Sequence, residues 1–131
     1  MSRVLVVDDQ ESVRRVLRTM IVSQTAFQLC GEASDGLQAL QMAVDLNPQV
    51  ILMDISMPGL NGLEATRRII KALPEAEVLI ISQYESPQAI RAAQEAGARG
   101  YLPKCHAGKH LISALNTVSN HQPFFPSFPP G

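Results

Sequence analysis

Three aspartates stand at the ends of two short apolar runs in this sequence. Asp8 and Asp9 follow the run 4–7, and Asp54 follows the run 50–53. If these runs are neighbouring strands of a parallel sheet, their carboxyl ends bring the three carboxylates to one edge. Carboxylates that lie so close repel one another and favour a bound cation. Because oxygen ligands suit a hard ion such as Mg²⁺, the sequence predicts an acidic metal pocket.

The composition is that of one globular domain. The chain has 131 residues, 46% of them hydrophobic and 18% charged, and a domain of this size buries roughly two-thirds of its unfolded surface. A net charge of −1 gives no general attraction to nucleic acid or anionic membranes. The sequence has no apolar stretch of membrane-spanning length, and Cys30 and Cys105 are too few for a disulfide framework. We therefore expect a cytoplasmic protein with no membrane partner.

Short apolar runs alternate with helical periodicities along most of the chain. The expected strands are residues 3–7, 27–31, 50–54, 77–81 and 99–102. The expected helices are about 11–22, 36–47, 62–73, 87–96 and 107–119. Five such units predict an α/β fold, a doubly wound five-stranded parallel sheet with helices on both faces.

Each expected helix carries an apolar stripe that we expect to face the sheet. In the first helix the stripe is Val13, Val16, Leu17 and Met20, and in the second it is Leu37, Leu40, Ala43 and Val44. The last ten residues, 122–131, differ in composition, because they hold three phenylalanines and four prolines. This composition is typical of a linker outside the core.

A polar residue follows four of the five strands, and each lies in a short motif. The motifs are Val-Asp8-Asp9, Met53-Asp54-Ile-Ser-Met-Pro58-Gly59, Ile81-Ser82 and Gly100-Tyr101-Leu-Pro-Lys104. Together, over residues 3 to about 120, they resemble the receiver domain of bacterial two-component response regulators. The Gly-Tyr-Leu-x-Lys motif and the late aromatic-Pro segment look most like the LuxR/NarL-type transcription regulators.

The resemblance implies a flavodoxin-like sheet of order 2-1-3-4-5 and a role for each acid. Asp54 would be the phosphoacceptor that takes a phosphoryl group from a phosphohistidine on a sensor kinase. Asp8, Asp9, Asp54 and the backbone carbonyl of Ser56 would bind Mg²⁺. As a signalling receiver the domain would show only self-phosphotransfer and slow autodephosphorylation, and is not expected to be an enzyme.

The resemblance also implies a switch. Lys104 and Ser82 would contact the phosphoryl oxygens, and Tyr101 would turn inward behind Ser82. These motions would reshape the surface of the fourth helix, the fifth strand and the fifth helix, with homodimerisation as one possible result. In LuxR/NarL-type regulators this surface controls a transcriptional output domain. We therefore expect a receiver domain at 1–121 and a linker at 122–131, with DNA contacted only through an output domain missing from this chain.

Other interpretations of the same residues remain open. The chain is alternatively a stand-alone receiver or a pseudo-receiver that acts as an interaction module. A haloacid-dehalogenase-like phosphohydrolase also uses a strand-end aspartate, but it needs a second acid two residues later, where this sequence has Ser56. Ser82 and Tyr101 are alternatively a plain turn residue and an edge-strand aromatic. His106 and His110 have the spacing of a metal pair, but with no third ligand evident we interpret them as surface histidines.

Overall fold

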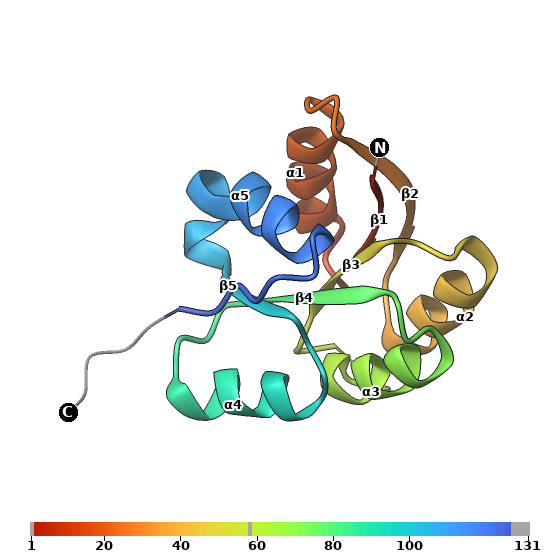
Figure 1. Ribbon diagram of the computed structural model, residues 1–131, viewed down its shortest axis with the longest axis vertical. Helices are drawn as coiled ribbons and strands as arrows, with labels where there is room; N and C mark the ends of the chain where they lie inside the picture. Colours follow the sequence, from red (N-terminus) through yellow and green to blue (C-terminus); the bar gives the residue numbers. More distant parts are fainter. Residues whose placement is uncertain (1, 58, 127–131) are drawn as a thin grey trace.

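A five-stranded parallel sheet of order β2-β1-β3-β4-β5 forms the centre of the computed structural model, which describes residues 2–57 and 59–126 (Figure 1). The strands are β1 (Ser2–Val7), β2 (Phe27–Ala33), β3 (Val50–Asp54), β4 (Glu77–Ser82) and β5 (Gly100–Pro103). The helices are α1 (Glu11–Val22), α2 (Gly36–Leu46), α3 (Gly62–Ala72), α4 (Pro87–Glu95) and α5 (Ala107–Ser119). The predicted fold class and strand order are confirmed.

The five helices divide between the two faces of the sheet. Helices α1 and α5 lie on one face, and α2, α3 and α4 lie on the other (Figure 1). Each face has its own apolar cluster, because alternate strand residues point in opposite directions. Leu52 packs with the α1 and α5 residues, whereas Met53 packs with those of α2, α3 and α4. The sheet is therefore covered on both sides, which explains why β3 and β4 are entirely buried.

The predicted buried stripes of α1 and α2 are partly wrong. Val16 is 60% exposed, Leu37 54% and Val44 55%. Helix α2 instead turns its smallest residues inward, and Gly36, Ala39 and Ala43 are buried. A side chain at Gly36 would place Cβ 2.2 Å from the carbonyl oxygen of Leu60, so only glycine permits this close approach.

The segment after α5 also departs from the prediction. Residues 122–126 were expected to lie outside the core, yet Phe124 and Phe125 pack against the apolar clusters of the two faces. Phe124 forms a bridge beside β5, where it accepts a hydrogen bond from the Tyr101 N–H at 2.8 Å and donates one to Arg99 at 3.1 Å. The free edge of β5 explains the contact, since an edge strand offers unpaired backbone groups. Phe128 and the rest of the predicted linker lie outside the described residues.

The helices of residues 2–57 and 59–126 all fall short of the length and apolarity needed to cross a membrane.

Candidate functional site

The three predicted acids meet at the carboxyl edge of the sheet. The strand register explains this, because Val7 lies opposite Met53 and therefore Asp8 follows beside Asp54. The side chains of Asp8, Asp9 and Asp54 each offer an oxygen atom, and these atoms all lie within 4.8 Å of one another. Asp8 is fully buried and Asp54 is 3% exposed, whereas Asp9 faces solvent. The site thus combines two buried carboxylates with one that opens to water.

The acid cluster has the donors that a hard divalent cation requires. Asp8 Oδ1 accepts a hydrogen bond from the Gln10 N–H at 2.9 Å. Asp8 Oδ2 is buried, and no described residue donates it a hydrogen bond of good geometry, although the Lys104 ammonium lies 2.9 Å away. A buried carboxylate oxygen is costly unless positive charge lies beside it, and here one ammonium group faces three carboxylates. The carboxylate oxygens, which carry more negative charge than Lys104 alone offsets, fit an ion such as Mg²⁺.

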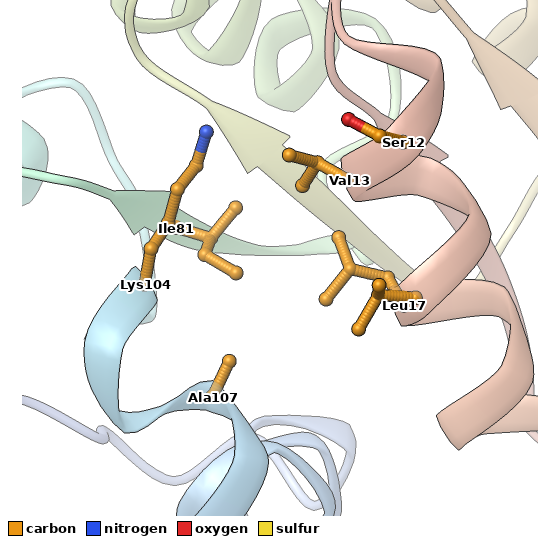
Figure 2. Close-up of a pocket in the computed structure, with 7 residues that line it drawn as sticks. Ser12, Val13, Leu17, Ile81, Lys104 and Ala107 are labelled. Atoms are coloured by element: carbon orange, nitrogen blue, oxygen red, sulfur yellow. The ribbon is translucent and has the colours of Figure 1, made fainter.

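Lys104 supplies a positive charge to the same site. Its Nζ lies 2.9 Å from Asp8 Oδ2 and 3.6 Å from Asp54 Oδ1, so it is nearer to Asp8 than to Asp54. Figure 2 shows its side chain extending from the turn before α5 past Ile81. Burial lowers the pKa of Lys104, but Asp8 and Asp54 outweigh this effect and raise it above its ordinary value. Lys104 is therefore charged and partly offsets the repulsion among the acids.

The carboxyl group of Asp54 has an unusual affinity for protons. Its pKa is raised from 3.8 to about 6, first by burial and then by the negative charge of Asp8. Lys104 and the Ser56 N–H, which lies 3.4 Å from Asp54 Oδ1, act in the opposite direction. An additional cation near Asp54 would therefore favour the ionised form of its carboxyl group.

The backbone around Asp54 is held by residues whose role the sequence interpretation missed. Gly62 begins α3 so close to β3 that a Cβ would lie 2.0 Å from the Asp54 carbonyl oxygen. Its N–H donates to the Ile55 carbonyl at 3.0 Å. Asn61 accepts from the Glu64 N–H at 3.0 Å and caps the helix. The signal was the Asn61-Gly62 pair, which fixes the loop after Asp54. Pro58 of this loop lies outside the described residues.

Ser82 and Tyr101 form a second small network with Tyr84. The Ser82 hydroxyl accepts a hydrogen bond from the Tyr84 N–H at 3.0 Å, and the Tyr101 hydroxyl donates to the Tyr84 carbonyl at 2.6 Å. Tyr101 is fully buried, and burial raises the pKa of its phenol against an opposing effect of Ser82. Tyr101 therefore already points inward, and its position depends on the backbone of the loop after β4.

An apolar hollow of about 320 Å³ opens beside Lys104, between α1 and the start of α5 (Figure 2). Ser12, Val13 and Leu17 line it from α1, and Ala107 lines it from α5. The exposed Val16 belongs to this hollow as well, which explains why an apolar residue of α1 faces outward. An apolar surface thus adjoins the charged site.

The family model for the response regulator receiver domain matches residues 4–116. The chain belongs to this family. It is 36% identical over 123 residues to the transcriptional regulatory protein LiaR of Bacillus subtilis, which covers 94% of this chain and 58% of LiaR. It is 33% identical over 117 residues to the chemotaxis protein CheY of Thermotoga maritima, which covers 89% of this chain and 97% of CheY.

Solved structures agree with this assignment of the receiver domain. A crystal structure of a LuxR-family two-component response regulator from Aurantimonas superposes with a TM-score of 0.91 at 29% identity, covering 95% of this chain and 89% of that one. The receiver is therefore of the LuxR/NarL type, as the motifs predicted. It spans little more than half the length of LiaR. Membership of this family excludes the dehalogenase-like alternative.

Proposed function

We propose that this receiver domain accepts a phosphoryl group on Asp54 from the phosphohistidine of a sensor kinase. The observation that supports the proposal is the convergence of Asp8, Asp9 and Asp54 with the ammonium group of Lys104. A carboxylate oxygen of Asp54 forms a bond to phosphorus while the bond between phosphorus and the donor's imidazole nitrogen breaks. The phosphoryl group is transferred to the chain, and the site does not turn over a substrate.

The residues around Asp54 would have different roles in this transfer. Asp8, Asp9, Asp54 and the backbone carbonyl of Ser56 would hold Mg²⁺, which supplies positive charge to an anionic nucleophile and an anionic phosphoryl group. When Asp54 is phosphorylated, the ammonium group of Lys104 would move from the carboxylates to a phosphoryl oxygen, because it lies at the end of a flexible side chain.

The network of Ser82, Tyr84 and Tyr101 would transmit the change. A phosphoryl oxygen on Asp54 offers the Ser82 hydroxyl a new acceptor, and a movement of Ser82 disturbs its bond with the Tyr84 N–H. Because Tyr84 also accepts from Tyr101, the loop after β4 and the strand β5 respond together. The Tyr101 N–H in turn donates to Phe124, so β5 contacts the chain that leaves the domain.

The apolar hollow beside Lys104 and the relatives of this chain indicate its partners. The apolar hollow beside Lys104 gives a sensor kinase a docking surface next to the phosphoacceptor. By analogy with LiaR, whose name describes a transcriptional regulator, the output would be a DNA-binding domain beyond residue 131. DNA would be contacted through that domain alone, and the protein would act in the cytoplasm.

Phosphoryl transfer to the purified chain tests the proposal. Incubation with acetyl phosphate and Mg²⁺ should add one phosphoryl group by intact-protein mass spectrometry. Asp54→Asn should abolish this addition, because an amide is not a nucleophile towards phosphorus, whereas Asp45→Asn on the exposed side of α2 should leave it unchanged. Undiminished labelling of the Asp54→Asn protein would place the chemistry elsewhere.

Self-association is the second expected consequence. Beryllofluoride with Mg²⁺ should mimic the phosphorylated state and increase the sedimentation coefficient of wild-type protein. The Asp54→Asn protein should sediment identically with and without the reagent. Identical sedimentation of treated and untreated wild-type protein would argue against a dimerisation switch.

A further inference from the structure

A second set of potential metal ligands gathers outside the acid pocket. Glu85, Cys105 and His106 each offer one ligand atom, and these atoms lie within 4.8 Å of one another. Glu85 Oε1 lies 3.6 Å from His106 Nε2 and 3.9 Å from Cys105 Sγ. All three side chains are exposed, so a dissolved ion can reach them. They come from two loops, and this is why the sequence showed no third ligand for the histidine pair.

The fold brings the two loops together through the pairing of β4 with β5. Ser82 lies opposite Pro103, so the residues after each strand end leave the sheet side by side. Glu85 belongs to the loop after β4, while Cys105 and His106 belong to the 3₁₀ turn Lys104–His106 after β5. His110 follows one helical turn later, and its ring centroid is 6.1 Å from that of His106 in an edge-on arrangement.

The separations of the ligand atoms match those around a small tetrahedral ion. Zn²⁺ binds nitrogen, oxygen and sulfur at about 2.0–2.3 Å, so ligand atoms on a tetrahedron lie about 3.4–3.7 Å apart. The observed 3.6 and 3.9 Å therefore require shifts of only a few tenths of an ångström. The ring centroid of His110 lies 6.1 Å from that of His106, so the His110 side chain would have to rotate to become a fourth ligand.

The donor types select a different ion from that of the acid pocket. Thiolate and imidazole are borderline-soft ligands that favour Zn²⁺ and related transition metals, whereas Mg²⁺ prefers oxygen alone. We propose that a transition-metal ion of the Zn²⁺ type binds to Glu85, Cys105, His106 and His110. Binding releases the thiol proton of Cys105 to solvent, because the thiolate is the ligand.

The position of this site connects it with the switch, although this step rests on the proposed function. Glu85 directly follows Tyr84, whose backbone holds both Ser82 and Tyr101. A bound ion would tie this loop to the turn that contains Lys104 and Cys105. Metal binding itself does not depend on phosphorylation, so the site can be tested in the unphosphorylated protein.

Cobalt substitution tests the site with a signal that the acid pocket cannot produce. Metal-free, reduced 131-residue protein is titrated with Co²⁺ in excess Mg²⁺, and sulfur-to-cobalt charge-transfer absorption is recorded. We expect the band to saturate at one equivalent and to disappear when Zn²⁺ displaces Co²⁺. Oxygen ligands give no such band, so failure of the proposed phosphoacceptor would not affect this result.

Matched variants identify the ligands. Cys105→Ser should abolish the band, while Cys30→Ser, which changes the other cysteine, should keep it. Glu85→Gln and His106→Gln should each weaken Co²⁺ binding by about tenfold or more, the loss typical of disturbing a metal site. Because Glu85, Cys105 and His106 are exposed, their substitution should not unfold the protein. A loss of Co²⁺ binding would therefore report the loss of a ligand. Absence of the band in wild type, or its persistence in Cys105→Ser, would overturn the proposal.

Discussion

Replacing Lys104 by alanine should destabilise the metal-free protein by about 3 kcal/mol at neutral pH. The ammonium group lies 2.9 Å from Asp8 and 3.6 Å from Asp54, and both carboxylates are buried. Its removal leaves two close negative charges without a counter-charge, which costs far more than losing an exposed ion pair. Urea denaturation in EDTA measures the difference in the free energy of unfolding.

Mg²⁺ separates this explanation from a general loss of packing. The ion should restore most of the stability of the Lys104→Ala protein, because it replaces the missing positive charge, and Mg²⁺ affinity should be retained. The response to acetyl phosphate should nevertheless weaken, since no ammonium group meets the phosphoryl oxygen. Lys109→Ala provides the control, because Lys109 is an exposed lysine of α5. A Lys104→Ala protein that fails to bind Mg²⁺ would show that Lys104 supports the metal ligands instead.

Asp54→Asn should stabilise the metal-free protein at neutral pH by roughly 1–3 kcal/mol. The pKa of Asp54 is raised from 3.8 to about 6 by burial and by Asp8. Between these two values the folded protein keeps a proton that the unfolded chain has lost. The stability of the wild type therefore falls as pH rises from about 4 to about 6, and the full cost persists above about 6.

The asparagine variant lacks this cost, so its advantage should vanish near pH 4 and reach its maximum above pH 6. Denaturation series in EDTA between these pH values measure the effect, and Asp45→Asn controls for the loss of one negative charge. If the asparagine variant were more stable than the wild type by the same amount at pH 4 and at pH 7, the ionisation of Asp54 would not be the source of the difference. Because protons compete for the same carboxylate, Mg²⁺ binding to wild type should also weaken below about pH 6.

Strand ends and helix caps were predictable because they depend on local sequence. The start of α4 at Ser86-Pro87 and its end before Gly97 follow from a side-chain cap, a proline at the first helical position and a positive φ of 98°. The acids were predictable for the same reason, because each directly follows an apolar strand. Parallel pairing then brings neighbouring strand ends together without further information.

The sequence-based predictions were wrong where a contact depends on small residues or on segments far apart in the sequence. Periodicity counts large apolar side chains, so it assigned Leu37 and Val44 to the core, whereas α2 approaches through Gly36 and its alanines. The docking of Phe124 depends on the open edge of β5, which composition does not reveal. The pairing of Glu85 with Cys105 depends on two loops far apart in the sequence. Each of these features requires the tertiary structure.

The location of the phosphoryl group tests the central proposal most directly. Borohydride reduces an aspartyl phosphate to homoserine, which marks the modified residue. After treatment with acetyl phosphate and Mg²⁺, reduction and digestion, peptide mass spectrometry should find homoserine at position 54 and none at positions 8 or 9. Homoserine at Asp8 or Asp9, or an unmodified Asp54 in labelled protein, would contradict the assignment of Asp54 as the phosphoacceptor.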